Sequence, residues 1–360
     1  MVNRTYNFGA GPATMPTEVL LEVQDELLDW KGLGISVMEI SHRSEEFTEI
    51  VKEAEIDFRD LLSIPDNYSV IFTHGGASLQ NAMIPLNLIN EEGSSSYVDS
   101  GYWASRSMKE ASKFCEVNIA ASSEDKGYSY FPPQDTWEIN KSSNYLHITP
   151  NETIGGVALR EFKESNTPLV GDFSSSILSE SIDVSKFGLI YGGAQKNIGP
   201  SGLGFAILRK DLLGSADQRV PSLLNYEIID KGNSMFNTPP TFPWYIAGKV
   251  FKWLKAKGGV EGISKINIRK AKKLYEYIDS SEFYLNKIES NSRSIMNIPF
   301  LLRNEGLNSA FLNKSSEAGL LALKGHRSVG GMRASIYNAM PEEGVDSLID
   351  FMNLFEKNLG

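Results

Sequence analysis

The chain has 360 residues, enough for about two domains and a large buried core. Hydrophobic residues make up 41% and charged residues 22%, an ordinary balance that argues against disorder along the whole chain. The formal net charge is −10 and no long basic run occurs, so the sequence argues against non-specific nucleic-acid binding. A small anionic substrate is not excluded, because a pocket needs only a few local cations.

The chain has a single cysteine, Cys115, which forbids an intramolecular disulfide and any paired-cysteine zinc or redox motif. We interpret it as a small buried hydrophobic residue rather than a reactive thiol. No stretch approaches the ~18 consecutive apolar residues of a membrane span, and the N-terminal segment lacks the apolar region of a signal peptide. We therefore predict a cytoplasmic protein without a membrane partner.

Two amphipathic helices are predicted near the N-terminus. In residues 45–62 the apolar side chains recur with the 3.6-residue helical period, and Ser44 can cap the first turn. Residues 17–30 have a similar pattern and end before a Lys-Gly pair. A short apolar strand over 70–73, a Gly-Gly turn and a helix from Ser78 follow.

The middle of the chain contains short apolar runs that end in turn residues. They lie at 95–101, 144–152, 168–176, 187–196 and 202–213. Because helical stretches separate them, we predict an α/β fold with a mostly parallel sheet and helices on both faces. Polar side chains directly after such strands would lie at the carboxyl edge of the sheet, where open α/β sheets bind ligands.

The composition changes near residue 258. A helical segment at 241–259 leads into a basic helix at 266–278, and lysines in such charge-rich helices usually lie on the surface. Strand-like segments and a closing amphipathic helix from Pro341 follow. We predict a large domain over 16–257 and a smaller α+β domain formed by 258–360 together with 1–15.

The turn Gly75-Gly76-Ala77-Ser78 is a candidate anion site. A strand, a glycine turn and a helix start place free backbone N–H groups and the positive end of the helix dipole at one point. Many strand-to-helix turns contain two glycines, so an ordinary turn remains an alternative. The Walker pattern GxxxxGK[ST] does not occur in the sequence, which excludes a P-loop.

Lys196 follows an apolar strand and lies in a glycine-rich bend, not on a charged helix face. A desolvated lysine can lose its proton and form a Schiff base. Asp172 ends another apolar strand, 24 residues upstream. An acid can hold a cofactor's pyridine nitrogen protonated, although a turn cap is an alternative reading of Asp172 alone.

Two of the four histidines directly precede an arginine, in His42-Arg43 and His326-Arg327. Arginine can bind a phosphate or carboxylate with two hydrogen bonds, and histidine adds a further donor. Arg333 is a third candidate cation. Exposed polar loops are the alternative interpretation of both pairs, and no metal-binding spacing such as HExxH occurs.

With these residues the chain resembles the phosphoserine aminotransferase family. Its members are class-V aminotransferases with the type I fold of pyridoxal phosphate (PLP) enzymes. The resemblance runs from end to end. Its motifs are NFGAGPATMP at 7–16, SHRS at 41–44, GGAS at 75–78, GYWA at 101–104, DFSSSILS at 172–179, GAQKNIGPSGL at 193–203, NTPPT at 237–241 and GHRSVGGMRASIYNAMP at 325–341.

The resemblance implies roles for particular residues. Lys196 would be the Schiff-base lysine and proton shuttle, and Asp172 the partner of the pyridine nitrogen. The expected cofactor-binding residues are Ala77, Ser78, Trp103, Thr153, Asp172, Gln195, Lys196, Asn237 and Thr238, the last two reaching the neighbouring subunit of a homodimer. The expected substrate-binding residues are His42, Arg43, His326, Arg327 and Arg333, and no metal is expected.

The implied reaction converts L-glutamate and 3-phosphohydroxypyruvate into 2-oxoglutarate and O-phospho-L-serine, a step of serine biosynthesis. Some bacterial relatives also use 4-phosphohydroxythreonine in pyridoxine biosynthesis, and the sequence leaves that substrate open. Two alternatives share the fold. A PLP-dependent lyase such as a cysteine desulfurase would need a nucleophilic cysteine, and lone Cys115 lies in a strand-like stretch. A non-catalytic PLP-binding protein would be expected to lack Lys196 or Asp172.

Overall fold

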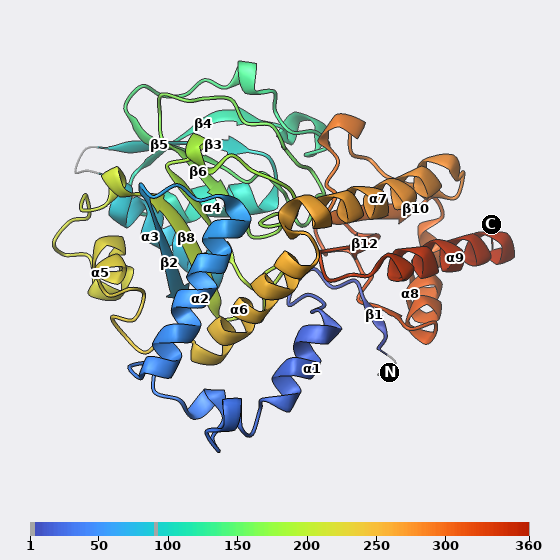
Figure 1. The fold of residues 1–360 in the computed structure, drawn as a ribbon. Coiled ribbons are helices and arrows are strands. Elements are labelled where there is room, and N and C mark those ends of the chain that lie inside the picture. The colour runs from blue at the N-terminus through green and yellow to red at the C-terminus, as the bar shows by residue number, and fades with distance from the viewer. Residues whose placement is uncertain (1–3, 90–92, 360) are drawn as a thin grey trace.

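A seven-stranded sheet organises the larger part of the molecule (Figure 1). The computed structural model describes residues 4–89 and 93–359. In spatial order the strands are β2 (Tyr68–His74), β8 (Leu203–Arg209), β7 (Leu189–Gly193), β6 (Leu169–Asp172), β5 (Ser143–Ile148), β3 (Ser94–Asp99) and β4 (Glu116–Ser122). Only β8 runs against the others, pairing antiparallel with β2 and β7. The predicted mostly parallel sheet is confirmed.

The helices agree with most of the sequence predictions. Ser44 caps the predicted helix over 45–62, accepting a hydrogen bond from the N–H of Phe47 at 3.3 Å. The helix predicted from Ser78 begins two residues earlier, at Gly76. The α-helices are α1 (Thr17–Asp25), α2 (Glu45–Leu62), α3 (Gly76–Leu88), α4 (Tyr102–Ala111), α5 (Tyr226–Lys231), α6 (Thr241–Ala256), α7 (Gly259–Ser280), α8 (Asn308–Glu317) and α9 (Glu342–Leu359).

The prediction of a helix over 17–30 is wrong at its C-terminal end. Helix α1 ends at Asp25, and Trp30 begins a separate 3₁₀ turn in which Lys31 has a φ of 52°. Trp30 is buried because the loop folds back, with its N–H bonded to the carbonyl of Ile35 at 2.9 Å. Tertiary burial, not helical continuation, thus accounts for this apolar position.

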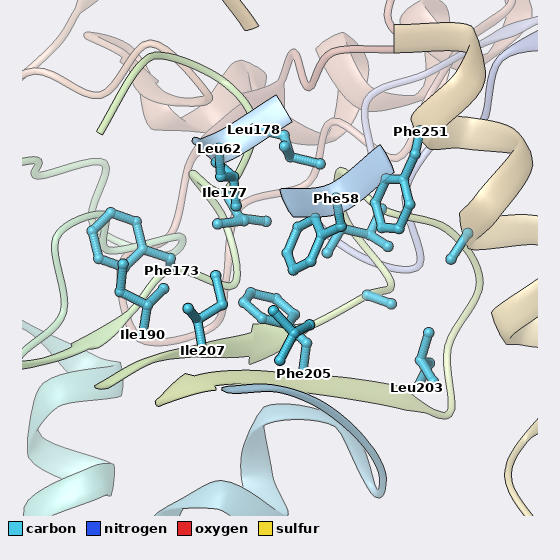
Figure 2. Packing of buried hydrophobic residues seen from close by; sticks show 14 of the residues in the cluster. Phe58, Leu62, Phe173, Ile177, Leu178, Ile190, Leu203, Phe205, Ile207 and Phe251 are labelled. Atoms are coloured by element: carbon cyan, nitrogen blue, oxygen red, sulfur yellow. The ribbon is translucent and has the colours of Figure 1, made fainter. Parts of the chain in front are cut away.

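Successive side chains of each strand point to opposite faces of the sheet, as the strand period of two requires. On β8, Phe205 and Ile207 join the core beneath α2 and α6, whereas Ala206 and Leu208 join the core on the opposite face. Figure 2 shows the first core at close range, where the Phe58 ring stacks on a phenylalanine of α6 and meets Phe205 edge-on at 5.5 Å. Helices therefore cover both faces.

The C-terminal part forms a separate antiparallel sheet with strands β9 (Tyr284–Leu285), β10 (Asn297–Leu302) and β12 (Met332–Ser335). Helices α7, α8 and α9 surround it on the right in Figure 1. The N-terminal strand β1 (Tyr6–Asn7) pairs with β11 (Leu320–Leu321), so the N-terminal segment packs with the C-terminal part of the chain.

Hydrophobic side chains from Phe8 and residues 271–355 form one core around the antiparallel sheet. Val260 and Ile263, at the start of α7, belong instead to the core of the large sheet. Helix α7 thus contributes to both cores. The division at residue 258 stays a prediction, and its terminal residues 1–3 and 360 lie outside the described residues. Within the described ranges, no helix combines the length and apolar character needed to span a membrane.

Candidate active site

A cavity of about 670 Å³ lies at the carboxyl edge of the large sheet. Strands β2, β3, β5, β6 and β7 run in the same direction, so the segments that follow them meet at this edge. The volume is typical of a small-molecule site. The predicted site residues among its lining are Ala77, Ser78, Trp103, Thr153, Asp172, Gln195, Lys196, His326 and Arg333.

Lys196 lies three residues beyond the end of β7 and projects its amine into this cavity. Its Nζ donates a hydrogen bond to Thr153 Oγ1 at 2.7 Å. Burial lowers the pKa of Lys196 to about 8, while the carboxylates of Asp172 and Glu152 oppose that effect and Arg333 reinforces it. A useful fraction of the amine is therefore unprotonated near neutral pH.

Asp172, the last residue of β6, is oriented by its neighbour Ser174. Its Oδ1 accepts hydrogen bonds from the Ser174 N–H at 2.9 Å and the Ser174 hydroxyl at 2.5 Å. Burial raises the pKa of Asp172, whereas these bonds and the charge of Lys196 lower it. The carboxylate is held rigidly in the cavity wall, so it can meet a positively charged ring nitrogen of a ligand.

Trp103 lies in the first turn of α4, with its ring centroid 5.9 Å from Lys196 Nζ. The Nε1 of Trp103 is buried and has no hydrogen-bond partner within the described part of the chain. Thr153, whose hydroxyl holds Lys196, is 3% exposed and follows β5. An aromatic face and a fixed hydroxyl thus lie beside the same amine.

The glycine turn that the sequence predicts as an anion site lies directly before α3. Gly75 caps the helix at a φ of 76°, and no side chain bonds the first turn of α3. A side chain at Gly75 would meet Leu79 Cβ at 2.9 Å, so the position requires glycine. The N–H groups of Gly76, Ala77 and Ser78 begin the helix beside the cavity and suit a phosphate.

Arg333 and His326 supply cationic and polar groups at another part of the wall. Arg333 Nη1 donates to the backbone carbonyl of Thr153 at 3.2 Å, while its Nε is buried without a partner among the described residues. His326 Nδ1 lies 2.7 Å from Ser328 Oγ, and its ring centroid is 5.2 Å from that of Tyr102. Burial, then the charge of Arg333, lowers the pKa of His326.

Five predicted site residues do not line this cavity: His42, Arg43, Arg327, Asn237 and Thr238. All except His42 are exposed in this chain. The half-buried ring of His42 has an unpartnered Nε2 within the described ranges, and Asn237 lines a different cavity of about 340 Å³. A single chain therefore brings together the predicted lysine, carboxylate and cradle but only part of the predicted substrate-binding set.

The residues present fit the cofactor that the resemblance implies. The cavity offers a phosphate cradle, a carboxylate, an aromatic face and an amine of lowered pKa. It also contains buried polar atoms that lack partners among the described residues, namely Trp103 Nε1, Thr149 Oγ1 and Arg333 Nε. Such orphaned atoms are costly unless a ligand or water satisfies them.

Cys115 is half-buried next to β4 and does not line the cavity. Its Sγ lies 3.3 Å from Ser95 Oγ, and burial raises the pKa of the thiol. This environment does not favour a nucleophilic thiolate. Within residues 4–89 and 93–359, no cluster of three or more His, Cys, Asp or Glu side chains could hold a metal ion.

Glu152 is a fully buried acid beside Lys196, and the sequence predicted no role for it. Its carboxylate accepts hydrogen bonds from the N–H groups of Trp103 at 3.1 Å and Ala104 at 2.9 Å. Like Asp172, Glu152 is an acid near the end of an apolar strand, and this pattern could have indicated it. Its partners on α4 could not be read from the local sequence.

The chain matches the family model for class-V aminotransferases over residues 5–348. A phosphoserine aminotransferase of Hahella chejuensis is 54% identical over 356 residues, covering 99% of both chains. The solved phosphoserine aminotransferase of Bacillus circulans subsp. alkalophilus is 44% identical with a TM-score of 0.98 over 99% of both chains. A PLP-bound phosphoserine aminotransferase from Trichomonas vaginalis is 39% identical with a TM-score of 0.92, covering 97% of this chain and 100% of its own. The chain therefore belongs to the class-V aminotransferases and, among them, to the phosphoserine aminotransferase family.

Proposed function

We propose that this chain is a PLP-dependent enzyme that transfers the amino group of L-glutamate to 3-phosphohydroxypyruvate. The products are 2-oxoglutarate and O-phospho-L-serine, which places the reaction in serine biosynthesis, in the cytoplasm. The observation that carries the proposal is the Lys196 amine, with its pKa lowered to about 8, among Thr153, Asp172 and a helix N-terminus in one cavity. When bound, the cofactor supplies an electron sink for the carbanion left after the substrate's α-proton is removed.

In this proposal each wall of the cavity holds one part of the cofactor. Asp172, held by Ser174, would pair with the pyridine nitrogen, and its negative charge would favour the protonated ring. Trp103 would stack on the ring, and Thr153 would bond the phenolic oxygen. Ala77 and Ser78 at the start of α3, together with Gln195, would bind the phosphate.

Lys196 carries the proton in this mechanism. Its unprotonated Nζ removes the α-proton from the amino acid and later returns a proton to complete the transfer. Thr153 keeps the amine oriented, since their hydrogen bond fixes the Nζ position at 2.7 Å. Arg333 pairs with the α-carboxylate common to glutamate and phosphoserine. The two substrates use one cavity in turn, so ping-pong kinetics are expected.

A homodimer with shared sites completes the proposal. His42, Arg43, Asn237 and Thr238 lie outside their own chain's cavity, as residues contributed to a neighbouring subunit would. In the family, Asn237 and Thr238 would reach the partner's cofactor phosphate. The pairs His42-Arg43 and His326-Arg327 would hold the distal phosphate of phosphoserine or the γ-carboxylate of glutamate.

The direct test is a coupled assay of purified protein with phosphoserine and 2-oxoglutarate. Sustained formation of glutamate is expected, and unphosphorylated serine should be a poor substrate. Glutamate supplied alone separates the alternatives. With glutamate, an aminotransferase releases one 2-oxoglutarate per site and stops, and a binding protein releases none. A cysteine desulfurase would instead turn over continuously when cysteine is supplied alone. Turnover of serine equal to that of phosphoserine would contradict the assigned specificity.

Arginine variants test how the two anionic ends are divided. A charged hydrogen bond left unpaired in a buried site costs roughly 2–5 kcal/mol. Arg43→Ala and Arg327→Ala should therefore lower kcat/KM for phosphoserine about 30- to several-thousand-fold. Alanine, which lacks a distal anion, should be a poor donor that loses little further activity in either variant. Arg333→Ala should impair every amino-acid donor alike, and unchanged phosphoserine kinetics in the first two variants would refute the division.

Subunit complementation tests the shared site. The double variant Asn237→Ala/Thr238→Ala should retain cofactor poorly, and Lys196→Ala should be inactive. Mixing the two should restore activity in hybrid dimers, because one of their two sites receives both intact contributions. If subunit exchange is verified and activity does not return, each site is built within one chain.

A further inference from the structure

A buried carboxylate beside the proposed reaction centre has no role in the mechanism above. Glu152 is 0% exposed and directly precedes Thr153, whose hydroxyl holds the Lys196 amine. Burying a carboxylate is costly unless hydrogen bonds or a cation compensate. The buried carboxylate of Glu152 therefore requires such compensation, and the N–H groups of helix α4 supply it.

Glu152 serves as the cap of a helix that belongs to another part of the sequence. The residue before α4 is Gly101, which has no side chain to bond the first turn. Glu152 instead accepts the N–H groups of Trp103 through Oε2 and of Ala104 through Oε1. A carboxylate at a helix N-terminus also interacts favourably with the helix dipole.

The approach of the two segments is specific. A Cβ on Gly101 would lie 2.8 Å from Glu152 Cδ, and the backbone there has a φ of 155°. Glycine at 101 therefore lets the carboxylate reach the helix end. Because Trp103 is one of the two residues bonded, the same contact fixes the backbone position from which the Trp103 side chain extends.

Glu152 also acts on the charges in the cavity. The charged groups that influence its carboxylate are Asp172 and Lys196, and the N–H groups of Trp103 and Ala104 face it from α4. Burial, with Asp172 adding to it, raises the pKa of Glu152 to about 7, against those N–H groups and Lys196. In return, Glu152 is one of the two carboxylates that support the protonated form of Lys196.

We propose that Glu152 is a positioning residue of the active site, which fixes Trp103 through the first turn of α4 and supplies part of the negative charge facing Lys196. The inference rests on the proposed function for the meaning of these two residues. Its structural content is independent of the substrate. Two effects of Glu152 should therefore be separable by substitution: the effect of its charge on Lys196, and the effect of its side-chain length on the contact with α4.

The decisive variant is Glu152→Gln, which keeps the length of the side chain and removes its charge. The readout is the rate at which an amine-acylating reagent modifies Lys196 in the cofactor-free protein, followed by mass spectrometry across pH. The midpoint of that profile should move down by roughly one pH unit, because a neighbouring anion no longer favours the ammonium form. Above about pH 7, where wild-type Glu152 is ionised, the difference should be largest.

The matched control is Glu180→Gln, which removes a partly buried acid that lies near Arg160 instead of Lys196. Its profile should follow that of the wild type. Glu152→Asp retains the charge but is one methylene too short to span the same contact. It should preserve the Lys196 midpoint while shifting the emission of Trp103, isolated by subtracting the spectrum of Trp103→Phe.

In the loaded enzyme, Glu152→Gln should lower kcat roughly 10- to 100-fold with little change in KM for phosphoserine, because Arg333 and the other predicted anion-binding residues are intact. A Lys196 profile identical to that of wild type, with unaltered kcat, would overturn the proposal and leave Glu152 a purely structural residue. A wild-type protein inactive with phosphoserine would instead refute the proposed function, since the acylation profile uses no substrate.

Discussion

Two lysines lie in the interior of the molecule and differ in what surrounds them. Lys196 reaches into a cavity, where one hydroxyl accepts its hydrogen bond and two carboxylates face it. Lys270 of α7 is 0% exposed and donates to three backbone carbonyls, those of Ile336 at 3.1 Å and of Tyr337 and Met340 at 2.9 Å. Burial lowers the pKa of both amines.

The difference shows that a lowered pKa does not identify a reactive lysine. The three carbonyls use the full donor capacity of the Lys270 ammonium and favour its charged form. They belong to the segment just after β12, the strand that carries Arg333. Lys270 therefore holds the segment behind one wall of the candidate active site in place, whereas Lys196 keeps its amine open to a ligand.

The largest expected effect is on chemistry. In the proposed mechanism Lys196→Ala would remove both the covalent attachment point and the proton carrier, so turnover with phosphoserine should fall at least about 10⁴-fold. Its thermal unfolding midpoint should change little, since one hydrogen bond is lost and the two neighbouring carboxylates, whose pKa values burial raises, can take up a proton. Activity assays and calorimetry on the same preparation check both statements. Substantial residual turnover would show that another group moves the proton.

The converse effect, on stability, is expected for Lys270→Met. Three carbonyls lose their donor in the interior, which should lower the free energy of unfolding by about 2–4 kcal/mol in urea titrations. Lys272→Met is the matched control on the same helix. Lys272 is mostly exposed and forms a surface ion pair with Glu276, so it should change stability by less than about 0.5 kcal/mol. Equal effects of the two substitutions would contradict the assigned role of Lys270.

The sequence predicted one of these lysines and not the other, for a physical reason. Lys196 follows an apolar strand and a glycine bend, so its local context indicated a buried site. Lys270 lies in a basic helix, where lysines are usually exposed, and that general expectation is wrong for it. Its partners are carbonyls about 70 residues away, which no local pattern reveals.

The same limit separates the predicted from the unpredicted parts of the molecule. Short apolar runs that end in turn residues predicted most strands of the large sheet, and the 3.6-residue period predicted helix α2. Parallel strands then bring Asp172, Thr153 and Lys196 to one edge. The end of α1 and the contact of Glu152 with α4 depend on tertiary packing, so the sequence could not supply them.

A third buried base, on strand β5 of the large sheet, extends the comparison. His147 is 0% exposed, its Nε2 lies 2.8 Å from Tyr191 Oη, and burial alone lowers its pKa to about 3. In the unfolded chain this pKa is 6.5. The unfolded state therefore binds more protons below about pH 6.5, and stability should be lost progressively as the pH falls from there toward 3.

At pH 5 the expected loss from His147 is about 2 kcal/mol, at 1.36 kcal/mol per pH unit. His147→Gln should flatten this part of the profile when unfolding is measured in urea between pH 5 and 7.5. His74→Gln is the control, because that histidine is exposed at the end of β2 and not in the core. If His147→Gln and wild type lose stability in parallel, other groups cause the acid sensitivity.

The smallest effect tests the single hydrogen bond that distinguishes Lys196 from the triply bonded Lys270. Thr153→Val keeps the shape of the side chain and removes the acceptor of the Lys196 amine. This bond and the proposed bond from the same hydroxyl to the cofactor contribute about 1 kcal/mol each, so kcat should fall roughly 5- to 30-fold. Thr153→Ser retains the hydroxyl and should recover most of that loss. If valine and serine behave alike, the cavity walls and not the hydroxyl orient the amine, and the contrast between the two lysines rests on their charged neighbours alone.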